Sequence, residues 1–207
     1  MSAGLNEVWT QRLKSNGADF VYFVDISGLA VDEISEYHCA VLFGKAISKD
    51  YIRALRADEK PRTKEVINTE RKIETLAVTL AEQLEAEGHK STAKLKFGAL
   101  PHKTVALRAG LGFIGKNNLL VTELYGCALM LGRVLTAAPF LTTSTMPEEP
   151  RCGDCTICVD TCPSKALLGT TWSVTTTRDE IMVRKSCVLC HKCMIWCPYT
   201  ERYASES

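Results

Sequence analysis

The sequence predicts an α+β protein that consists of an α/β domain and a separate cysteine-rich module. Two observations lead to this prediction. Helical and extended patterns alternate over residues 1–140, whereas eight of the ten cysteines lie in two short runs after residue 150. Between these parts, residues 141–150 (LTTSTMPEEP) are polar and contain proline, which is typical of a linker. We therefore expect an α/β domain at 1–140, a linker at 141–150 and a module at 151–207.

The elements of the first domain follow from apolar periodicity and from turn residues. Three segments have the pattern of a helix that ends at or beside a glycine: 4–17, 63–87 and 101–110. Four apolar segments, rich in aliphatic or aromatic residues, are expected strands: 19–28, 39–43, 118–122 and 127–135.

Composition and charge exclude several classes of protein. The 207 residues carry a formal net charge of +1, which gives no electrostatic reason to expect nucleic-acid or membrane binding. No apolar run approaches the roughly 20 residues that a membrane-spanning helix needs. Residues 1–17 lack the apolar core of an export signal. We therefore expect a cytoplasmic protein that makes no contact with a membrane.

The cysteine runs carry the strongest chemical signal. Both have the spacing C-x₂-C-x₂-C-x₃-C-P, which holds [4Fe–4S] clusters in bacterial two-cluster ferredoxins. Three closely spaced thiolates wrap one cluster, and the fourth thiolate of each run points away to complete the other cluster. The spacing assigns one cluster to Cys152, Cys155, Cys158 and Cys197. It assigns the other to Cys187, Cys190, Cys193 and Cys162.

Zinc and disulfides explain these runs less well. Structural zinc sites use paired C-x₂-C units with four ligands, and disulfide frameworks spread their cysteines along the chain. The 23 or so residues between the runs exceed what a minimal ferredoxin-type module needs. We expect a short helix from Pro163 and a small ribbon at 170–177 there. His191, between two ligands, is expected to be a solvated neighbour, since the ligand count is already complete.

Residues 108–121 (RAGLGFIGKNNLLV) match two nucleotide-binding motifs by letter. Gly110, Gly112 and Gly115 have the spacing of a dinucleotide-binding turn, and Gly110 to Lys116 that of a phosphate-binding loop without its final Ser or Thr. Both motifs require a strand before the glycines and a helix after them. Here the expected order is helix then strand, so neither nucleotide function is favoured. The open alternatives are a backbone surface for a cofactor and a plain tight turn with Lys116 in solvent.

At residues 102–126 (HKTVALRAGLGFIGKNNLLVTELYG), followed by VLTAAP and the two cysteine runs, the sequence resembles the epoxyqueuosine reductase superfamily. That superfamily is similar to the reductive dehalogenases, and the resemblance covers about Leu100 to Pro198. It implies a nitroreductase-like α/β domain that binds cobalamin, or a flavin in its place, and a ferredoxin-like module that supplies electrons. By position, the residues expected along that cofactor are Gly112, Phe113, Ile114, Gly115, Lys116 and Asn118.

Two departures from the superfamily concern its tRNA reaction. The stretch 93–110 contains no Asp or Glu, whereas the queuosine enzymes have an aspartic acid there that is thought to protonate the epoxide. The chain also ends soon after Cys197, so we expect no helical-repeat extension of the kind that helps hold tRNA. A short member of the superfamily with a different substrate is therefore expected.

A few other side chains have open alternatives. His102 is an acid/base group or a lower cobalt ligand, or else a structural hydrogen bonder. Tyr125 is a proton donor or a surface turn residue. Asp25 is a site carboxylate or a turn former, while Cys39 and Cys127 are expected to pack as small apolar residues.

The leading hypothesis is an iron–sulfur oxidoreductase that receives electrons from a donor such as ferredoxin or flavodoxin. Its two clusters would serve a cofactor in the first domain, and its substrate is an unidentified small molecule or protein. The alternative is an electron-transfer or reductive-activation protein that has no organic cofactor and donates to a partner. The 140 residues before the module favour a site or a docking surface over a bare carrier.

Overall fold

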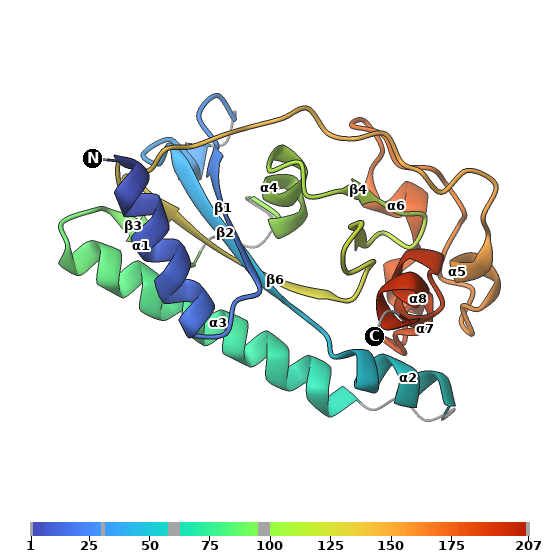
Figure 1. The fold of residues 1–207 in the computed structure, drawn as a ribbon. Helices are drawn as coiled ribbons and strands as arrows, with labels where there is room; N and C mark the ends of the chain where they lie inside the picture. The colour runs from blue at the N-terminus through green and yellow to red at the C-terminus, as the bar shows by residue number, and fades with distance from the viewer. Residues whose placement is uncertain (1, 30–31, 58–62, 95–99, 206–207) are drawn as a thin grey trace. The chain divides into compact units, whose positions relative to one another are not determined.

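The computed structural model describes residues 2–29, 32–57, 63–94 and 100–205. Its helices and strands are labelled in Figure 1. The chain divides into two compact units. Unit 1 comprises Met1–Lys45, Val66–Gly110 and Met130–Met146. Unit 2 comprises Ala46–Glu65, Leu111–Leu129 and Pro147–Ser207.

A four-stranded sheet with the order β1-β2-β6-β3 forms the centre of unit 1. Its strands are β1 (Phe20–Asp25), β2 (Cys39–Ala46), β3 (Ser91–Thr92) and β6 (Leu129–Thr136). β1 pairs antiparallel with β2, and β3 pairs antiparallel with β6. The apolar sequence of β2 is explained by this central position, because its first six residues are all buried.

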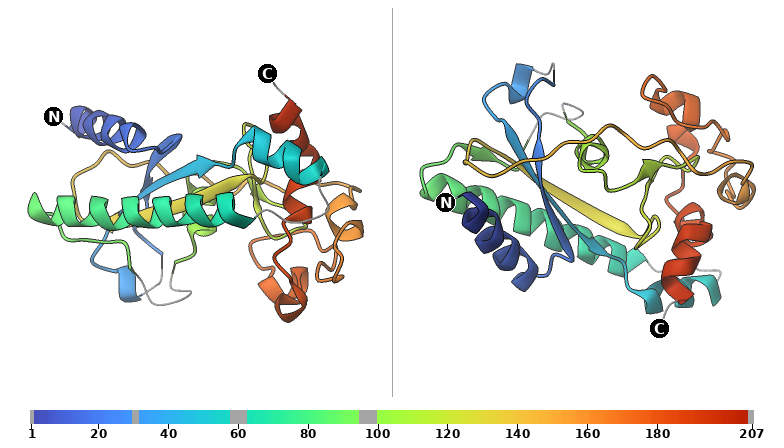
Figure 2. Two further views of the ribbon diagram at one scale, coloured as in Figure 1. Left: turned by 90° about the horizontal axis from the view of Figure 1, so that it is seen from below. Right: turned by 45° about the horizontal axis from the view of Figure 1, so that its top comes forward.

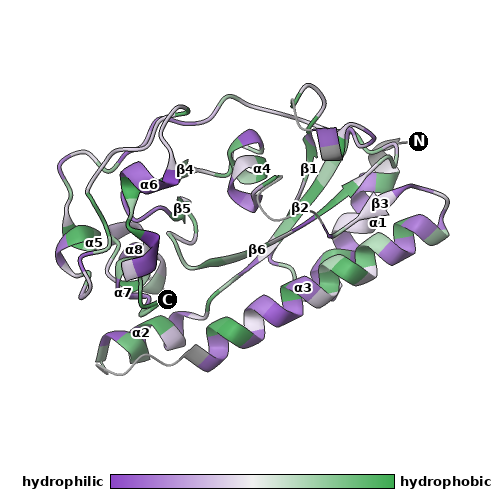
Figure 3. Cartoon of the chain, turned by 180° about the vertical axis from the view of Figure 1, so that it is seen from behind, coloured by the Kyte–Doolittle hydropathy of each residue, from purple (hydrophilic) through white to green (hydrophobic). Residues whose placement is uncertain are grey.

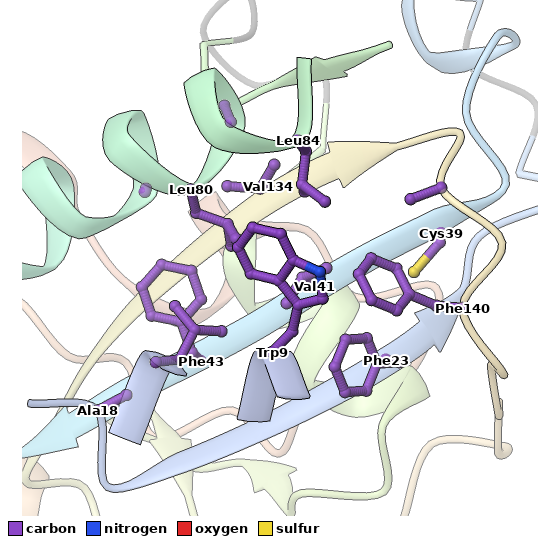
Figure 4. Close-up of a cluster of buried hydrophobic side chains, with 14 of the residues drawn as sticks. Trp9, Ala18, Phe23, Cys39, Val41, Phe43, Leu80, Leu84, Val134 and Phe140 are labelled. Atoms are coloured by element: carbon purple, nitrogen blue, oxygen red, sulfur yellow. The ribbon is translucent and has the colours of Figure 1, made fainter. Parts of the chain in front are cut away.

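Two long helices, α1 (Ser2–Ser15) and α3 (Thr63–Ala86), cover one face of this sheet. Alternate residues of β2 point to that face, where Val41 and Phe43 meet Trp9 of α1 and Leu80 of α3 (Figure 4). Figure 2 shows the same two helices from two further directions. Apolar and polar residues recur along α3 in Figure 3, as expected of a helix with one buried face.

The apolar stripe predicted on the long helix is confirmed. Of its five residues, Leu76 is half-buried and the others are at most 6% exposed: Val66, Ile73, Leu80 and Leu84. The expected helices at 4–17, 63–87 and 101–110 correspond to α1, α3 and α4 (His102–Arg108). The expected strands at 19–28, 39–43 and 127–135 correspond to β1, β2 and β6.

Unit 2 contains short elements that are joined by turns. Its strands β4 (Phe113–Ile114) and β5 (Leu120–Val121) pair antiparallel with each other, so the strand expected at 118–122 lies outside the larger sheet. Its helices are α2 (Lys49–Ala57), α5 (Ile157–Asp160), α6 (Arg178–Ile181), α7 (Lys192–Ile195) and α8 (Pro198–Ser205). Two single 3₁₀ turns, Asp32–Ile34 in unit 1 and Arg184–Ser186 in unit 2, complete the elements.

Two local predictions within unit 2 are wrong. No helix begins at Pro163, because the helical turn of this run, α5, lies before that proline. No strand occurs at 170–177, where Ser173 and Thr176 instead form a hydrogen-bonded turn. The helical turn α6 follows it, and a capping box between Thr177 and Glu180 stands at the N-terminus of α6.

The two compact units do not correspond to the two parts of the chain before and after residues 141–150. Unit 2 takes up α2 and residues 111–129 in addition to the cysteine runs. Residues 141–146 belong to unit 1, where Leu141 exchanges two hydrogen bonds with Asn6, and Thr145 N–H donates to the Arg108 carbonyl. The division into domains at 140 and 150 stays a prediction. In the described part of the chain, no helix has both the length and the apolar character to cross a membrane.

Candidate metal centre

The glycine stretch has the element order that excludes both nucleotide motifs. Helix α4 precedes it, β4 lies within it and β5 follows it, so no helix opens after Gly115. Gly112 has a φ of +155°, and a Cβ at this position would lie 2.0 Å from the Val121 carbonyl oxygen. Glycine is therefore required at residue 112 by the close approach of β5, which needs no bound phosphate.

The residues after these glycines contact the cysteine runs. Lys116 is 9% exposed, and its ammonium donates to the carbonyls of Gly153 (2.7 Å) and Cys155 (3.3 Å). Asn117 Nδ2 donates to the Cys193 carbonyl at 3.1 Å, in the second run. The expectation that Lys116 lies in solvent is therefore wrong. Its side chain is buried in unit 2 and links the segment after β4 to the loop of the first cysteine run.

The first predicted ligand set is gathered around one cavity. Cys152, Cys155, Cys158 and Cys197 line a cavity of about 170 Å³, together with neighbours that include Lys116. Cys197 comes from the second run, and the other three come from the first. Cysteines of both runs therefore border one cavity, and their assignment to one cluster stays a prediction.

The members of the second predicted ligand set come near thiols of both runs. The thiols that act electrostatically on Cys193 include Cys187 and Cys190 of its own run and Cys162 of the first run. Cys158, from the first set, acts on Cys193 as well. Cys158 and Cys162 share one buried cluster, with Cys187 and Cys193 packed against it. The two sets are therefore neighbours within unit 2.

Burial raises the pKa values of two of these thiols. Desolvation, with the charge of neighbouring thiols, raises the pKa of Cys158 to about 11 and that of Cys193 to about 12. Desolvation is the larger cause for both residues. Thiols with such pKa values stay protonated at neutral pH, whereas a bound metal removes the proton.

Cys197 has the opposite behaviour because its sulfur accepts several hydrogen bonds. The Cys127 thiol is the main donor, and the backbone N–H groups of Tyr199 and Thr200 also donate to it. These bonds outweigh burial and lower the pKa of Cys197 to about 7. The residue also directly precedes α8, whose N-terminus favours a negative charge.

The donor sets fit a cluster better than a single ion. Among residues 2–29, 32–57, 63–94 and 100–205, no group of three or more His, Cys, Asp or Glu side chains is placed so that it could hold one metal ion. A single zinc ion would draw each sulfur to about 2.3 Å. A cubane cluster stands between its four thiolates and keeps them apart, which suits four cysteines arranged around a cavity.

The six residues predicted along a corrinoid lie together in unit 2 and are all buried: Gly112, Phe113, Ile114, Gly115, Lys116 and Asn118. The adjacent cavity of about 170 Å³ is well below the 300 Å³ or so that drug-sized ligands need, and a corrinoid is larger still. Within unit 2 these residues therefore do not form a corrinoid cradle by themselves. Their role at such a cofactor stays a prediction.

The two predicted catalytic side chains lie in different units. His102 of unit 1 borders a cavity of about 460 Å³ with Glu70 and Arg133. Desolvation of its ring and the Arg133 charge lower the pKa of His102 to about 4, although the residue as a whole keeps an exposed surface. Tyr125 of unit 2 is half-buried, and its ring packs edge-on against Tyr203 at 5.7 Å.

Other open alternatives are settled by local contacts. Asp25 is a turn former, because its Oδ1 accepts from Ser27 N–H at 2.8 Å and from the Ser27 hydroxyl. Cys39 packs in the core of unit 1 as expected. Cys127 is also buried as expected, and its sulfur in addition accepts from Asn117 Nδ2 at 3.3 Å. His191 is half-buried, not solvated, and its Nδ1 has no hydrogen-bond partner among the described residues.

Sequence reasoning missed two functional candidates, Asn117 and Cys127. Asn117 stands where a phosphate-binding loop has its magnesium-binding Ser or Thr. A polar amide between Gly115 and an apolar strand is itself a signal of a buried hydrogen-bonding role. The stretch 93–110, which has no acidic residue, includes 95–99, and those five positions lie outside the described residues.

Comparison with known proteins gives relatives over part of the chain, although no family model matches it. The chain is 50% identical over 78 residues to an epoxyqueuosine reductase of Lactococcus garvieae, which covers 38% of this chain and 22% of the relative. It is 36% identical over 118 residues to that of Listeria monocytogenes, which covers 50% of this chain and 31% of the relative. The matched segments thus span less than a third of these enzymes.

Solved structures share the fold over nearly the whole chain. A crystal structure of epoxyqueuosine reductase with a tRNA-Tyr stem loop matches 97% of this chain and 66% of its own, with a TM-score of 0.65 and 19% identity. A reductive dehalogenase structure that suggests a mechanism for B12-dependent dehalogenation matches 89% of this chain and 30% of its own, with a TM-score of 0.70 and 17% identity. The chain is therefore similar to epoxyqueuosine reductases in part of its sequence, and to these enzymes and a reductive dehalogenase in its mixed α/β fold, which confirms the resemblance.

Proposed function

We propose that the chain is an iron–sulfur oxidoreductase of the epoxyqueuosine-reductase type. Cys152, Cys155, Cys158 and Cys197 would hold the first cluster, and Cys187, Cys190, Cys193 and Cys162 the second cluster. The observation that supports the proposal is that Cys197 of the second run lines one cavity with Cys152, Cys155 and Cys158 of the first run. Each [4Fe–4S] cluster would supply one-electron transfer, from a donor such as ferredoxin or flavodoxin to the site of reduction.

The protein's own contribution is to hold the thiolates, to donate hydrogen bonds to their sulfurs and to limit their contact with water. Cys158, Cys162 and Cys197 are each at most 9% exposed. Cys162 Sγ accepts from the Ala166 N–H at 3.3 Å. Burial and such hydrogen bonds are the protein's means of setting a cluster's reduction potential.

The electron acceptor that the resemblance implies is a corrinoid, or a flavin in its place. The B12-dependent dehalogenase of similar fold supports the corrinoid. The six residues predicted along this cofactor are all buried within unit 2. We further propose that the substrate is a small molecule or a protein and not tRNA, which is supported by the lack of Asp or Glu at 93–110.

The second candidate function is an electron-transfer or reductive-activation protein without an organic cofactor. It is favoured by the small size of the cavity beside the glycine stretch, about 170 Å³. Both candidates share the two clusters and differ only in the acceptor. Binding of cobalamin or flavin to the full chain therefore distinguishes them.

The test is the iron and sulfide content of the chain after anaerobic purification. We expect about eight iron atoms per chain and broad absorbance near 400 nm, and about four iron atoms in Cys155→Ala and in Cys190→Ala. Cys39→Ala, which removes a buried thiol from the core of unit 1, is the matched control and should keep all the iron. Zinc in place of iron, or full iron in both run variants, would overturn the cluster assignment.

The acceptor is tested by titrating the same protein with cobalamin and with flavin. Micromolar binding of cobalamin, seen as a shift of its visible spectrum, would support the oxidoreductase. No binding of either cofactor would exclude the oxidoreductase and leave the electron-transfer protein.

A further inference from the structure

Lys116 places a positive charge inside unit 2, next to the first cluster. Its ammonium is held by the carbonyls of Gly153 and Cys155, both in the loop that carries three ligands of that cluster. Lys116 also lines the cavity that Cys152, Cys155, Cys158 and Cys197 border. One residue thus fixes the ligand loop and also contributes charge to the cluster's surroundings.

Cys127 is a buried thiol that lies outside the two cysteine runs. Its backbone N–H donates to Thr200 Oγ1 at 2.9 Å, which fixes the residue against the start of α8. Its sulfur accepts from Asn117 Nδ2 at 3.3 Å. The same thiol is the main donor to the sulfur of Cys197.

We propose that Lys116 and Cys127 are positioning residues of the first cluster and that they raise its reduction potential. The inference rests on the proposed function and adds to it the residues that set the potential of one cluster. Neither residue belongs to the ligand runs. Lys116 holds the carbonyl of the ligand Cys155, and Cys127 is bonded to Thr200, in the segment that follows the ligand Cys197.

The direction of the effect follows from electrostatics. Reduction adds a negative charge to a cluster, so a nearby cation and hydrogen bonds to its sulfurs stabilise the reduced form. Burial strengthens both effects, since Lys116 is 9% and Cys127 4% exposed. The thiolates in turn compensate the cost of keeping an ammonium away from water.

The experiment is a redox titration of the full chain, with each cluster followed by electron paramagnetic resonance. Lys116→Gln removes the charge and Lys116→Arg keeps it. Cys127→Ala removes the thiol donor and Cys127→Ser keeps a donor. We expect Lys116→Gln and Cys127→Ala to lower the midpoint potential of the first cluster, while the two conservative variants stay closer to the unchanged chain.

Matched controls come from unit 1. Lys45 also donates to a backbone carbonyl, that of Gly17 at 3.1 Å, and Cys39 is also fully buried. Lys45→Gln and Cys39→Ala should leave both potentials unchanged. The second cluster should shift less than the first in every variant.

An unaltered first-cluster potential in Lys116→Gln and Cys127→Ala, at full iron content, would overturn the inference. If Lys116→Gln fails to take up the first cluster, its positioning role is supported and Cys127→Ala decides the effect on potential. The proposed function fails in a different way, namely if the unchanged chain shows no pair of cluster signals.

Discussion

Gly126 is the residue at which the turn after β5 meets the segment that follows Cys197. Its φ is +56°, and a Cβ there would lie 2.3 Å from the Thr200 backbone nitrogen. The next residue, Cys127, is bonded to the Thr200 hydroxyl. Two parts of unit 2 that are more than 70 residues apart in the chain are thus in close backbone contact at this point.

Gly126→Ala is expected to lower the free energy of unfolding more than Gly169→Ala. Gly169 also has a positive φ, +81°, but its Cβ would meet only Val159 at an ordinary 3.9 Å. The comparison isolates the steric clash, which should add about 1–3 kcal/mol to the backbone strain that both variants share. Urea unfolding of the two variants measures the difference. Equal losses would show that the turn can move away from α8.

Asp25 should contribute to stability in a pH-dependent way. The hydroxyl and N–H of Ser27 lower its pKa below the ordinary 3.8, with a smaller effect of Arg108 and His38. A carboxylate whose pKa is lowered by folding stabilises the fold above its unfolded pKa, and this stabilisation is lost as the pH falls through the folded value.

Ser27→Ala is therefore expected to raise the pKa of Asp25 and to weaken the acid sensitivity of unit 1. An NMR titration of the Asp25 carboxyl measures the first effect directly. Ser35→Ala is the control, because the Ser35 hydroxyl donates to the Asp32 carbonyl and not to a carboxylate. An unchanged pKa of Asp25 in Ser27→Ala would contradict the Ser27 hydroxyl as the main cause of the lowered pKa.

At the residue scale, the sequence allowed the partners of a residue to be predicted only where the spacing of a motif dictates them. The eight run cysteines could be sorted into two crossed sets because ferredoxin-type loops have a fixed geometry. The roles of Lys116 and Cys127 could not be predicted, since each depends on a partner between 37 and 73 residues away in the chain. A lysine or a single cysteine carries no local signal of such a partner.

Helix α2 shows the same limit at the scale of an element. It was not predicted, although Tyr51, Ile52 and Leu55 have helical spacing and are buried. It lies against α7 and α8, far along the chain, so its apolar face has no local partner. The Arg56 guanidinium donates to the Ile195 carbonyl, at 2.8 Å from Nε and 2.6 Å from Nη2, and thereby satisfies the last carbonyl of α7.

Arg56→Ala is expected to lower the free energy of unfolding by about 1–3 kcal/mol, because it removes two charged hydrogen bonds from a side chain that is 17% exposed. Hydrogen exchange of the α7 amides should accelerate. Arg53→Ala is the comparison: Arg53 donates to the Ala204 carbonyl of α8 from a side chain that is 49% exposed. That variant should lose less than about 1 kcal/mol and affect α8 instead. Faster exchange of α7 in both variants would contradict separate roles.

Other elements were predictable to the degree that their burial is periodic. The stripe on α3 and the apolar run of β2 each have a face that the sequence displays. The short segment 163–177 has no such pattern, and its expected helix and ribbon were wrong. The glycine stretch was understood correctly through the order of its neighbours, α4 before and β5 after, and not through its own letters.

At the scale of the whole molecule, the compact units draw on segments that are distant in the chain. Residues 111–129 and α2 belong to the unit of the cysteine runs. A reading from composition alone could not place them there, because their composition is that of an ordinary α/β domain. About 40 residues from the first two-thirds of the sequence therefore belong to the same compact unit as the candidate metal centre.

This organisation predicts a selective effect of iron removal. The core of unit 1 is built from large side chains such as Trp9, Phe43 and Leu84, each at most 1% exposed, and needs no metal. Unit 2 has short elements whose buried thiols would be held by the clusters, and metal binding of this kind contributes directly to folding. Chelation should therefore increase hydrogen exchange of α5 and α7 strongly, while the amides of β2 keep their protection.

Reconstitution with iron and sulfide should restore the protection of α5 and α7, which serves as the control for irreversible damage. An equal loss of protection in β2 would mean that the clusters stabilise both units. No loss in either unit would mean that unit 2 folds without metal, and the hydrogen bonds from Lys116, Asn117 and Arg56 would then suffice to hold it. We expect the selective loss in unit 2, because Cys158 and Cys193 keep their protons without metal and the cavity that Cys158 and Cys197 border stays unfilled.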